Sequence, residues 1–449
     1  MKKTFLFILV LSIFQNCTTT SPSTVGNTES KKENDVKAEE IDEYFEPKFQ
    51  ILQNKIYDKD IKTVRAHKSD WELSNSAIEH KTNDKITFSF DKIGENLGDF
   101  YYTIIHCNAD WKKSNLQEID YLDGFFQDFI NNYSFSFNTY AHYVHYEVTI
   151  PNKSMKIKET GNYIFKVFKD NDTEKVVLTK RFIVYENKII TRGKANRPSV
   201  IGERNYKQEI DFELDIQKLV IRDIGEDLKV VVQQNNRWDN AITDLKPLFI
   251  RGNQLIYDYN NEENIFDGGN EFRFLDIRNM RYRGQKVQQI ILDKRETNVY
   301  LFAEEKRRFK NYLFYKDLDG KFTVKNQFGS KQTIESDYVY THFALNYPQE
   351  LTGGDVYVYG GLSDNEYREE FKMTYNKLAK QYETKAFLKQ GYYDYYFMFK
   401  KAGEPGDVTL FEGDHFATEN MYTITTYLKD FMCNCDRIIG HSTFKSNQQ

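Results

Sequence analysis

Few residues of this 449-residue chain have types and spacings that could do chemistry. His106 and Cys107 are adjacent, with Asp110 close by, and so offer a thiol and a base. Neighbouring side chains on a strand point to opposite faces, so this pair cannot share a proton, and Cys107 is predicted to pack in a core. His142 and His145 are three residues apart, which on a strand also places them on opposite faces. Neither pair predicts a catalytic or metal site.

Motifs for other active sites are missing or incomplete. Asp317, Asp319 and Gly320 resemble the start of a calcium loop, but Gly329 lies near the position where the loop needs a bidentate Glu. Asp319-Gly320 instead predicts a hairpin turn. The sequence has no Gly-x-Ser-x-Gly, Walker or dinucleotide-binding motif. A hydrolase with two carboxylates stays an alternative without a local marker. We therefore expect no enzyme activity, no catalytic residues, no metal and no cofactor.

Basic and aromatic residues indicate protein contacts instead. Trp238 follows Arg237 in a turn, which suits either an interface anchor or a loop packed onto its own domain. Two basic stretches suit an acidic partner, anionic lipid heads or the solvated face of strands. The first stretch, interleaved with aromatic residues, contains Arg273, Arg278, Arg281, Arg283 and Lys286. The second stretch contains Lys306, Arg307, Arg308 and Lys310. The predicted partner-binding residues are Arg237, Trp238, Arg278, Arg281, Tyr282 and Arg283.

Composition excludes several classes of protein. Aromatic residues make up 16%, with 32 Tyr and 35 Phe, which is ample ring surface for a folded, strand-rich chain. The formal charge of -5 argues against nucleic-acid binding by the whole chain. A mean hydropathy of -0.69 and the lack of an 18-residue apolar run argue against a membrane-spanning helix.

The first 17 residues predict export. Lys2 and Lys3 precede a short apolar run, residues 5–14, and Cys17 follows it. This pattern resembles a bacterial lipoprotein signal and predicts lipidation of Cys17, with an ordinary signal peptide as the alternative. An exported chain with three further cysteines is not a disulfide scaffold. Cys433 and Cys435 could bridge, although only through a small ring.

The rest of the chain predicts an all-β fold of three consecutive β-sandwiches after the signal peptide and a polar linker, residues 18–58. Alternating apolar residues at 86–90, 133–137 and 144–150 each predict a strand with one buried face. The runs at 161–167 and 176–185 predict the last hairpin of an immunoglobulin-like sandwich, with Tyr163 as its tyrosine corner. The first domain is placed at 59–188.

Two further β domains are predicted. Alternating residues at 210–216 and 228–232, and a hairpin at 312–324, define a middle domain at 189–332. Strands at 338–345 and 355–359, with a hairpin of 382–388 and 392–399, define a third domain at 333–449.

Several stretches together resemble one family, the plug proteins of the type IX secretion system of Bacteroidetes. They are the segments 101–111, 118–125, 230–249, 268–273 and 276–278. The resemblance runs from about Ile61 onward. It implies a non-enzymatic protein that closes the periplasmic mouth of a giant outer-membrane β-barrel translocon. It also implies a location in the periplasm at the inner face of the outer membrane, and no small-molecule substrate.

The third domain separately resembles glycogen- and starch-binding early-set modules, through residues 356–365 and 389–399. Those modules stack sugar on a Trp where this chain has Asn365, so the resemblance implies a fold rather than sugar binding. An exported glycan-binding lipoprotein is the alternative function. Its discriminating feature would be an exposed pair of aromatic rings in the third domain.

Overall fold

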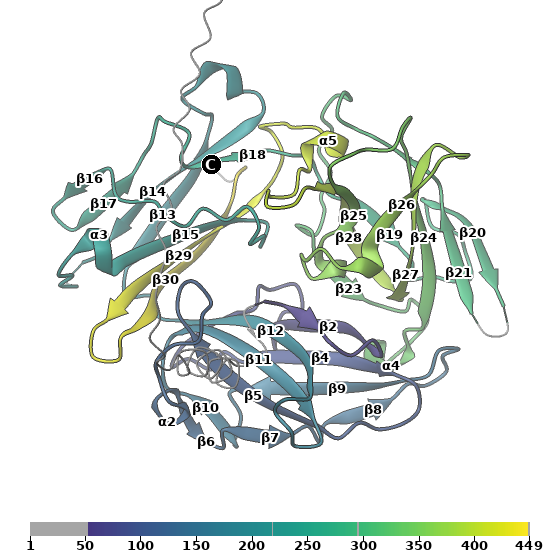
Figure 1. The fold of residues 1–449 in the computed structure, drawn as a ribbon, viewed down its shortest axis with the longest axis horizontal. Coiled ribbons are helices and arrows are strands. Elements are labelled where there is room, and N and C mark those ends of the chain that lie inside the picture. Colours follow the sequence, from purple (N-terminus) through teal and green to yellow (C-terminus); the bar gives the residue numbers. More distant parts are fainter. Residues whose placement is uncertain (1–52, 218, 294–295, 448–449) are drawn as a thin grey trace, which may run out of the picture. The chain divides into compact units, whose positions relative to one another are not determined.

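A computed structural model describes residues 53–217, 219–293 and 296–447 (Figure 1). The predicted signal peptide, Cys17 and most of the predicted linker lie outside these residues. Residues 51–449 form one compact unit. In its described part the fold is all-β, as predicted. The helices there are Glu118–Tyr121 (α2), Ile224–Asp227 (α3), Gln332–Glu335 (α4), Thr409–Glu412 (α5), Ile201–Glu203 (η1), Gly361–Ser363 (η2) and Glu369–Phe371 (η3). None of them is long and apolar enough to cross a bilayer.

The first sandwich consists of two mainly antiparallel sheets. One has the order β1 (Lys55–Ile56), β12 (Val176–Tyr185), β11 (Gly161–Lys169), β5 (Phe100–Cys107) and β7 (Gln127–Phe129), with β3 (Ala77–Glu79) parallel to β12. The other has the order β2 (Ile61–Lys68), β4 (Ile86–Ile93), β9 (Tyr143–Ile150) and β8 (Tyr133–Phe135). A small sheet pairs β6 (Leu122–Gly124) with β10 (Met155–Ile157). The first sheet begins at Lys55, inside the predicted linker, because β1 pairs with β12.

Aromatic rings fill the core of the first sandwich. Phe88 of β4 stacks on Phe165 of β11 with ring centroids 4.0 Å apart, which joins the two sheets. β11 and β12 form the predicted hairpin. Tyr163 is fully buried, and its hydroxyl donates to the Glu159 carbonyl at 2.8 Å. This bond to backbone a few residues upstream confirms the predicted tyrosine corner.

The second sandwich combines strands from distant parts of the sequence. One sheet has the order β13 (Ile190–Asn196), β14 (Lys207–Asp215), β17 (Gln254–Tyr257) and β16 (Phe249–Arg251), with β18 (Ile265–Asp267) also on β14. The other is β15 (Leu228–Gln234), β29 (Met421–Asp430) and β30 (Cys435–Lys445). Figure 1 shows the yellow β29 and β30 beside the teal β15.

The third group of strands is a single ten-stranded network. Its path is β19 (Arg273–Asp276), β28 (Gly391–Lys400), β25 (Asp355–Tyr359), β26 (Lys372–Asn376), β27 (Gln381–Lys389), β24 (Tyr338–Asn346), β21 (Thr297–Leu301) and β20 (Val287–Leu292). β22 (Glu304–Glu305) pairs with β24, and β23 (Phe322–Val324) pairs with β28. Phe343 of β24 packs edge-to-face on Tyr395 of β28, inside one apolar cluster.

The sheets cross the predicted boundary between residues 332 and 333. Strands from 273–301, assigned to the middle domain, pair with strands of the third. β29, assigned to the third domain, pairs with β15 of the second and carries β30 into the same sheet. Alternation along a segment identifies a strand but not its partner, and here the partners are far apart in sequence.

Two predicted hairpins are wrong. β27 and β28 follow one another but do not pair, because β27 bonds to β24 and β26 while β28 bonds to β19 and β25. In the second, Asp319 and Gly320 form the predicted turn, both with positive φ. The residues before it, 306–318, form no strand. A turn signal fixes the bend and not the structure that leads into it.

Candidate partner interface

Trp238 lies at a contact between the first two sandwiches. Its ring meets that of Trp111 edge-to-face, with centroids 5.2 Å apart. The Arg181 guanidinium lies 4.4 Å from the Trp111 centroid and 5.2 Å from that of Trp238. This arrangement combines aromatic packing with cation–π attraction. The predicted anchor therefore acts within the chain, as a loop packed onto a neighbouring domain.

Arg237 is buried and bound, with 4% of its surface exposed. Its Nε and Nη2 donate to the Asp239 carboxylate at 3.0 and 2.8 Å, and Nη2 also donates to the Gly406 carbonyl at 2.9 Å. Burial alone would raise the pKa of Asp239, but the Arg237 charge holds it well below the usual range. Arg237 connects a loop of the second sandwich to the third group of strands and is not available to a partner.

A cavity of about 170 Å³ lies beside the two tryptophans and is lined by residues of all three groups of sheets. Asn365, the position equivalent to the sugar-stacking Trp, is among them. Burial, followed by the nearby Asp364 charge, raises the pKa of Glu366 in its wall to about 7. The cavity is smaller than typical small-molecule sites. It offers no open platform for a polysaccharide at Asn365.

A buried charged cluster, which we call the Asp91 node, joins the first sandwich to the third group of strands. Asp91 of β4 is 1% exposed and accepts hydrogen bonds from Lys389 Nζ at 2.5 Å and the Tyr338 hydroxyl at 2.6 Å. His145 Nδ1 lies 2.6 Å from its other oxygen. Burial would raise the pKa of Asp91, but Lys389 and His145 outweigh it and lower the pKa.

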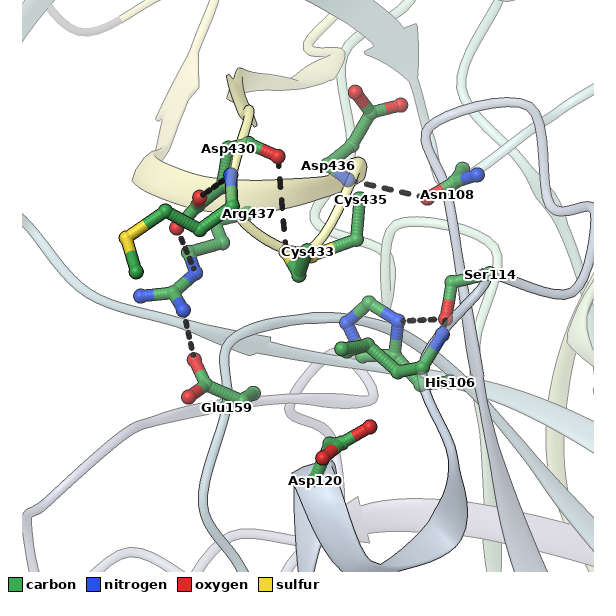
Figure 2. Close-up of a disulfide and its surroundings, with 12 residues drawn as sticks. His106, Asn108, Ser114, Asp120, Glu159, Asp430, Cys433, Cys435, Asp436 and Arg437 are labelled. Atoms are coloured by element: carbon green, nitrogen blue, oxygen red, sulfur yellow. Dashed lines mark hydrogen bonds and ion pairs between the residues drawn. A yellow bond between two sulfur atoms is a disulfide. The ribbon is translucent and has the colours of Figure 1, made fainter.

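The turn between β29 and β30 docks on the first sandwich and contains a disulfide between Cys433 and Cys435 (Figure 2). The Asp436 amide donates to Asn108 Oδ1 at 3.1 Å. Arg437 pairs with Glu159 at 3.1 Å. With the Trp238 contact and the Asp91 node, this turn makes residues 51–449 a cross-connected body.

The other predicted partner residues occupy a separate loop. Arg278 pairs with Asp276 at 2.6 Å and stacks on Tyr392. Arg281 is exposed and lies 4.3 Å from the ring of Phe328. Tyr282 is 72% exposed, and Arg283 Nη1 donates to the Gln288 carbonyl at 3.0 Å. The three consecutive residues 281–283 thus form an accessible basic and aromatic turn. The structure does not bring them near Arg237 or Trp238 through any contact among the described residues.

A second accessible surface was not predicted. β7 and β8 are the outer strands of the two sheets of the first sandwich, and the buried Ile130 anchors the short link between them. Large apolar side chains along this segment are between 39 and 65% exposed. They form what we call the aromatic edge: Phe125, Phe126, Phe129, Tyr133, Phe135, Phe137 and Tyr140. Exposed rings in this number are typical of contact surfaces.

The sequence prediction placed one face of residues 133–137 in a core. In the structure Tyr133, Phe135 and Phe137 are exposed, because no further strand covers β8. The sequence signal for this exposure is the number of aromatic residues rather than their alternation. Phe125, Phe126 and Phe129 come just before residue 133, so the segment has more aromatic rings than one buried face can hold.

The buried His106 and Cys107 have packing roles. His106 Nδ1 lies 2.8 Å from Ser114 Oγ, and Nε2 lies 3.1 Å from the Thr160 carbonyl. Burial raises the pKa of the Cys107 thiol to about 12, so it stays protonated near neutral pH. Within residues 53–217, 219–293 and 296–447, no group of three or more His, Cys, Asp or Glu side chains is placed to hold a metal ion.

Comparisons with known proteins point to one family. Residues 61–186, which form most of the first sandwich and contain the aromatic edge, match the family described as "Type 9 secretion system plug protein 1st domain". A crystal structure titled as a hypothetical protein from Parabacteroides merdae is 32% identical in sequence, with a TM-score of 0.84. The match covers 88% of this chain and 99% of that one. No curated protein matches the chain.

Proposed function

The chain belongs to the type IX secretion system plug protein family, and from that premise we propose that it occludes the periplasmic opening of the system's outer-membrane translocon without catalysing a reaction. Family membership gives the chain a role in type IX secretion, in contact with the secretion machinery and in the cell envelope. The finer proposal adds the giant barrel as the partner, the inner face of the outer membrane as the location, and a lipid anchor on Cys17.

The observation that carries the proposal is the aromatic edge. It lies in the part of the chain that matches the family, at two sheet edges where backbone groups of β7 and β8 have no outer strand. Rings such as Phe135 and Phe137 can be buried against a partner and released again, as in many transient interfaces. A barrel wide enough for folded cargo has to be closed by a bulky body, and the cross-connected unit 51–449 supplies one.

The experiment is recovery of the translocon barrel from detergent-solubilised membranes with a tagged copy of the chain. We expect the wild type to recover the barrel and the variant Phe135→Ser with Phe137→Ser to recover much less. The matched control is Leu248→Ser with Ile250→Ser, which removes two exposed apolar side chains (45 and 56%) at β16 of the second sandwich. Equal recovery by all three proteins would contradict the role of the aromatic edge.

A second measurement tests occlusion itself. Cells that lack the protein should become more permeable to an antibiotic too large for ordinary porins, and the wild-type chain should restore the barrier. If recovery of the barrel is intact but permeability never changes, the chain is a translocon partner and not a plug.

The glycan-binding alternative gains no support. Among residues 333–447, the large apolar side chains that are mainly exposed are Leu378, Phe431 and Met432, which do not include a pair of aromatic rings. Sugar binding would need such a platform.

A further inference from the structure

Residues 306–316, which we call the basic loop, have the sequence KRRFKNYLFYK and contain no carboxylate. Three of their side chains point into the protein. Arg307 Nε donates to Glu412 at 2.7 Å, the Tyr312 hydroxyl to the Ala417 carbonyl at 2.9 Å, and the Tyr315 hydroxyl to the Phe272 carbonyl at 2.6 Å. These bonds hold an irregular segment in place without strand pairing.

The apolar side chains of the basic loop lie outside. Phe309 is 81% exposed, Leu313 73% and Phe314 53%. Phe302, just before the loop, is 53% exposed. Leaving large apolar side chains in water is unfavourable, by an amount that rises with the apolar area exposed. A group of them on one short segment therefore suits burial in another phase or partner.

Cations alternate with these apolar side chains along the sequence, and two of them lie beside the Phe309 ring. Lys306, Arg308, Lys310 and Lys316 form no ion pair with any carboxylate among the described residues, whereas Arg307 pairs with Glu412. Lys306 Nζ and the Arg308 guanidinium lie 5.4 and 5.7 Å from the Phe309 ring centroid.

The nearest carboxylates in sequence are already occupied. Glu304 pairs with Arg273 and Lys286. Glu305 accepts from Asn346 at 2.8 Å. Asp317 accepts from the backbone amides of Phe272 and Asp319 at 2.8 and 2.9 Å. None of the four cations is paired with these carboxylates, and Glu305 keeps its own negative charge because its partner Asn346 is neutral. The basic loop therefore presents four positive charges, unpaired among the described residues, beside one acidic side chain.

We propose that the basic loop binds the surface of a membrane that contains anionic phospholipid, with Phe309, Leu313 and Phe314 inserted at the headgroup boundary. Exposed apolar side chains and unpaired cations on one short segment match the two attractions of such a surface, hydrophobic insertion and electrostatic binding to anionic headgroups. Internal anchoring by Arg307, Tyr312 and Tyr315 keeps the inserting side chains outward before contact. This proposal does not depend on the translocon partner.

The experiment is co-flotation of residues 18–449, which contain the whole compact unit and lack the predicted lipid anchor, with large vesicles. We expect binding to vesicles of equal parts phosphatidylcholine and phosphatidylglycerol, little binding to phosphatidylcholine alone, and release by salt. Each cation near an anionic surface contributes about fivefold in affinity, so Arg308→Gln with Lys310→Gln should weaken binding about 30-fold. The charge-matched control, Lys377→Gln with Lys401→Gln, should change the affinity for these vesicles by less than about threefold.

Insertion is tested separately. Phe309→Trp places a fluorophore on the basic loop, and brominated lipids should quench it only in vesicles that contain phosphatidylglycerol. Phe309→Ser with Leu313→Ser should reduce flotation, whereas Leu378→Ser, a control at a side chain that is 98% exposed, should not. The proposal is overturned if the wild type does not float with anionic vesicles, the result expected if the basic loop binds an acidic protein instead. It is also overturned if the loop variants float as well as their controls.

Discussion

Replacing Lys389 with Met should strongly destabilise the chain, because it removes the cation of the Asp91 node while keeping most of the side-chain volume. Lys389 is 2% exposed, and its Nζ lies 2.5 Å from Asp91 and 2.6 Å from the Thr333 carbonyl. At an effective dielectric constant of about 20 the attraction between the two charges is roughly 6–7 kcal/mol. Much of it offsets the cost of burying both charges, so the net worth of the pair is much smaller.

The substitution leaves the Asp91 carboxylate buried without Lys389, with His145 Nδ1 and the Tyr338 hydroxyl as its remaining partners. Breaking a buried pair from one side typically costs about 3–5 kcal/mol, and that is the expected loss in the free energy of unfolding. Urea denaturation followed by tryptophan fluorescence measures it, since Trp71, Trp111 and Trp238 report on the first two sandwiches. The control is Lys401→Met, which removes the exposed pair of Lys401 with Glu404 and should cost less than about 0.5 kcal/mol.

A double variant separates charge burial from a general packing defect. Asp91→Asn with Lys389→Met removes both charges, and we expect it to be more stable than Lys389→Met alone by about 2 kcal/mol. If Lys389→Met lost no more stability than Lys401→Met, or if the double variant lost the sum of both single effects, the node would not be a coupled pair and the reasoning would fail.

Three further changes have defined outcomes. Trp238→Ala should cost about 2–3 kcal/mol in the free energy of unfolding, because it removes a partly buried ring that packs on Trp111 and Arg181, and urea denaturation would show no change if that contact were absent. Tyr163→Phe should cost about 1–2 kcal/mol, measured in the same way, because the part-buried Glu159 carbonyl loses its donor; a neutral effect would contradict the tyrosine corner. Burial, and then the Asp317 charge, raises the pKa of Asp394 to about 8, above its unfolded value near 3.8, so its contribution to stability is complete below about pH 4 and is lost as pH rises through about 8. Asp394→Asn should therefore flatten the fall in thermal stability between pH 5 and 8, and an unchanged pH profile would show that Asp394 does not titrate there.

Much of the fold could be predicted from local patterns. Alternation at 144–150 gave β9 with its buried face, and the runs at 161–167 and 176–185 gave a hairpin and a tyrosine corner. These features depend on residues close in sequence, so the sequence alone contains the signal.

The candidate interfaces were harder to predict, because they depend on what covers each strand. A period of two shows that one face of residues 133–137 is apolar but not whether that face is covered, and here Tyr133, Phe135 and Phe137 stay exposed. In the same way, Arg237 reads as a surface cation until Asp239 and the Gly406 carbonyl are placed beside it. Asp239 is only two residues from Arg237, but Gly406 is 169 residues away, so the burial of Arg237 depends on a contact that local patterns do not contain.

The pairing of β15 with β29 has a consequence for assembly of the protein. Leu228 of β15 lies opposite Leu428 of β29, and the whole third group of strands lies between them in the sequence. The second sandwich can therefore be completed only after the third group has been synthesised. Until then, the edge of β15 that pairs with β29 is open, and Tyr422 and Ile424 are missing from the apolar cluster that contains Val230 and Val232. A chain interrupted before residue 421 would display an open strand edge beside an incomplete apolar core, a feature that chaperones and proteases can distinguish from the finished protein.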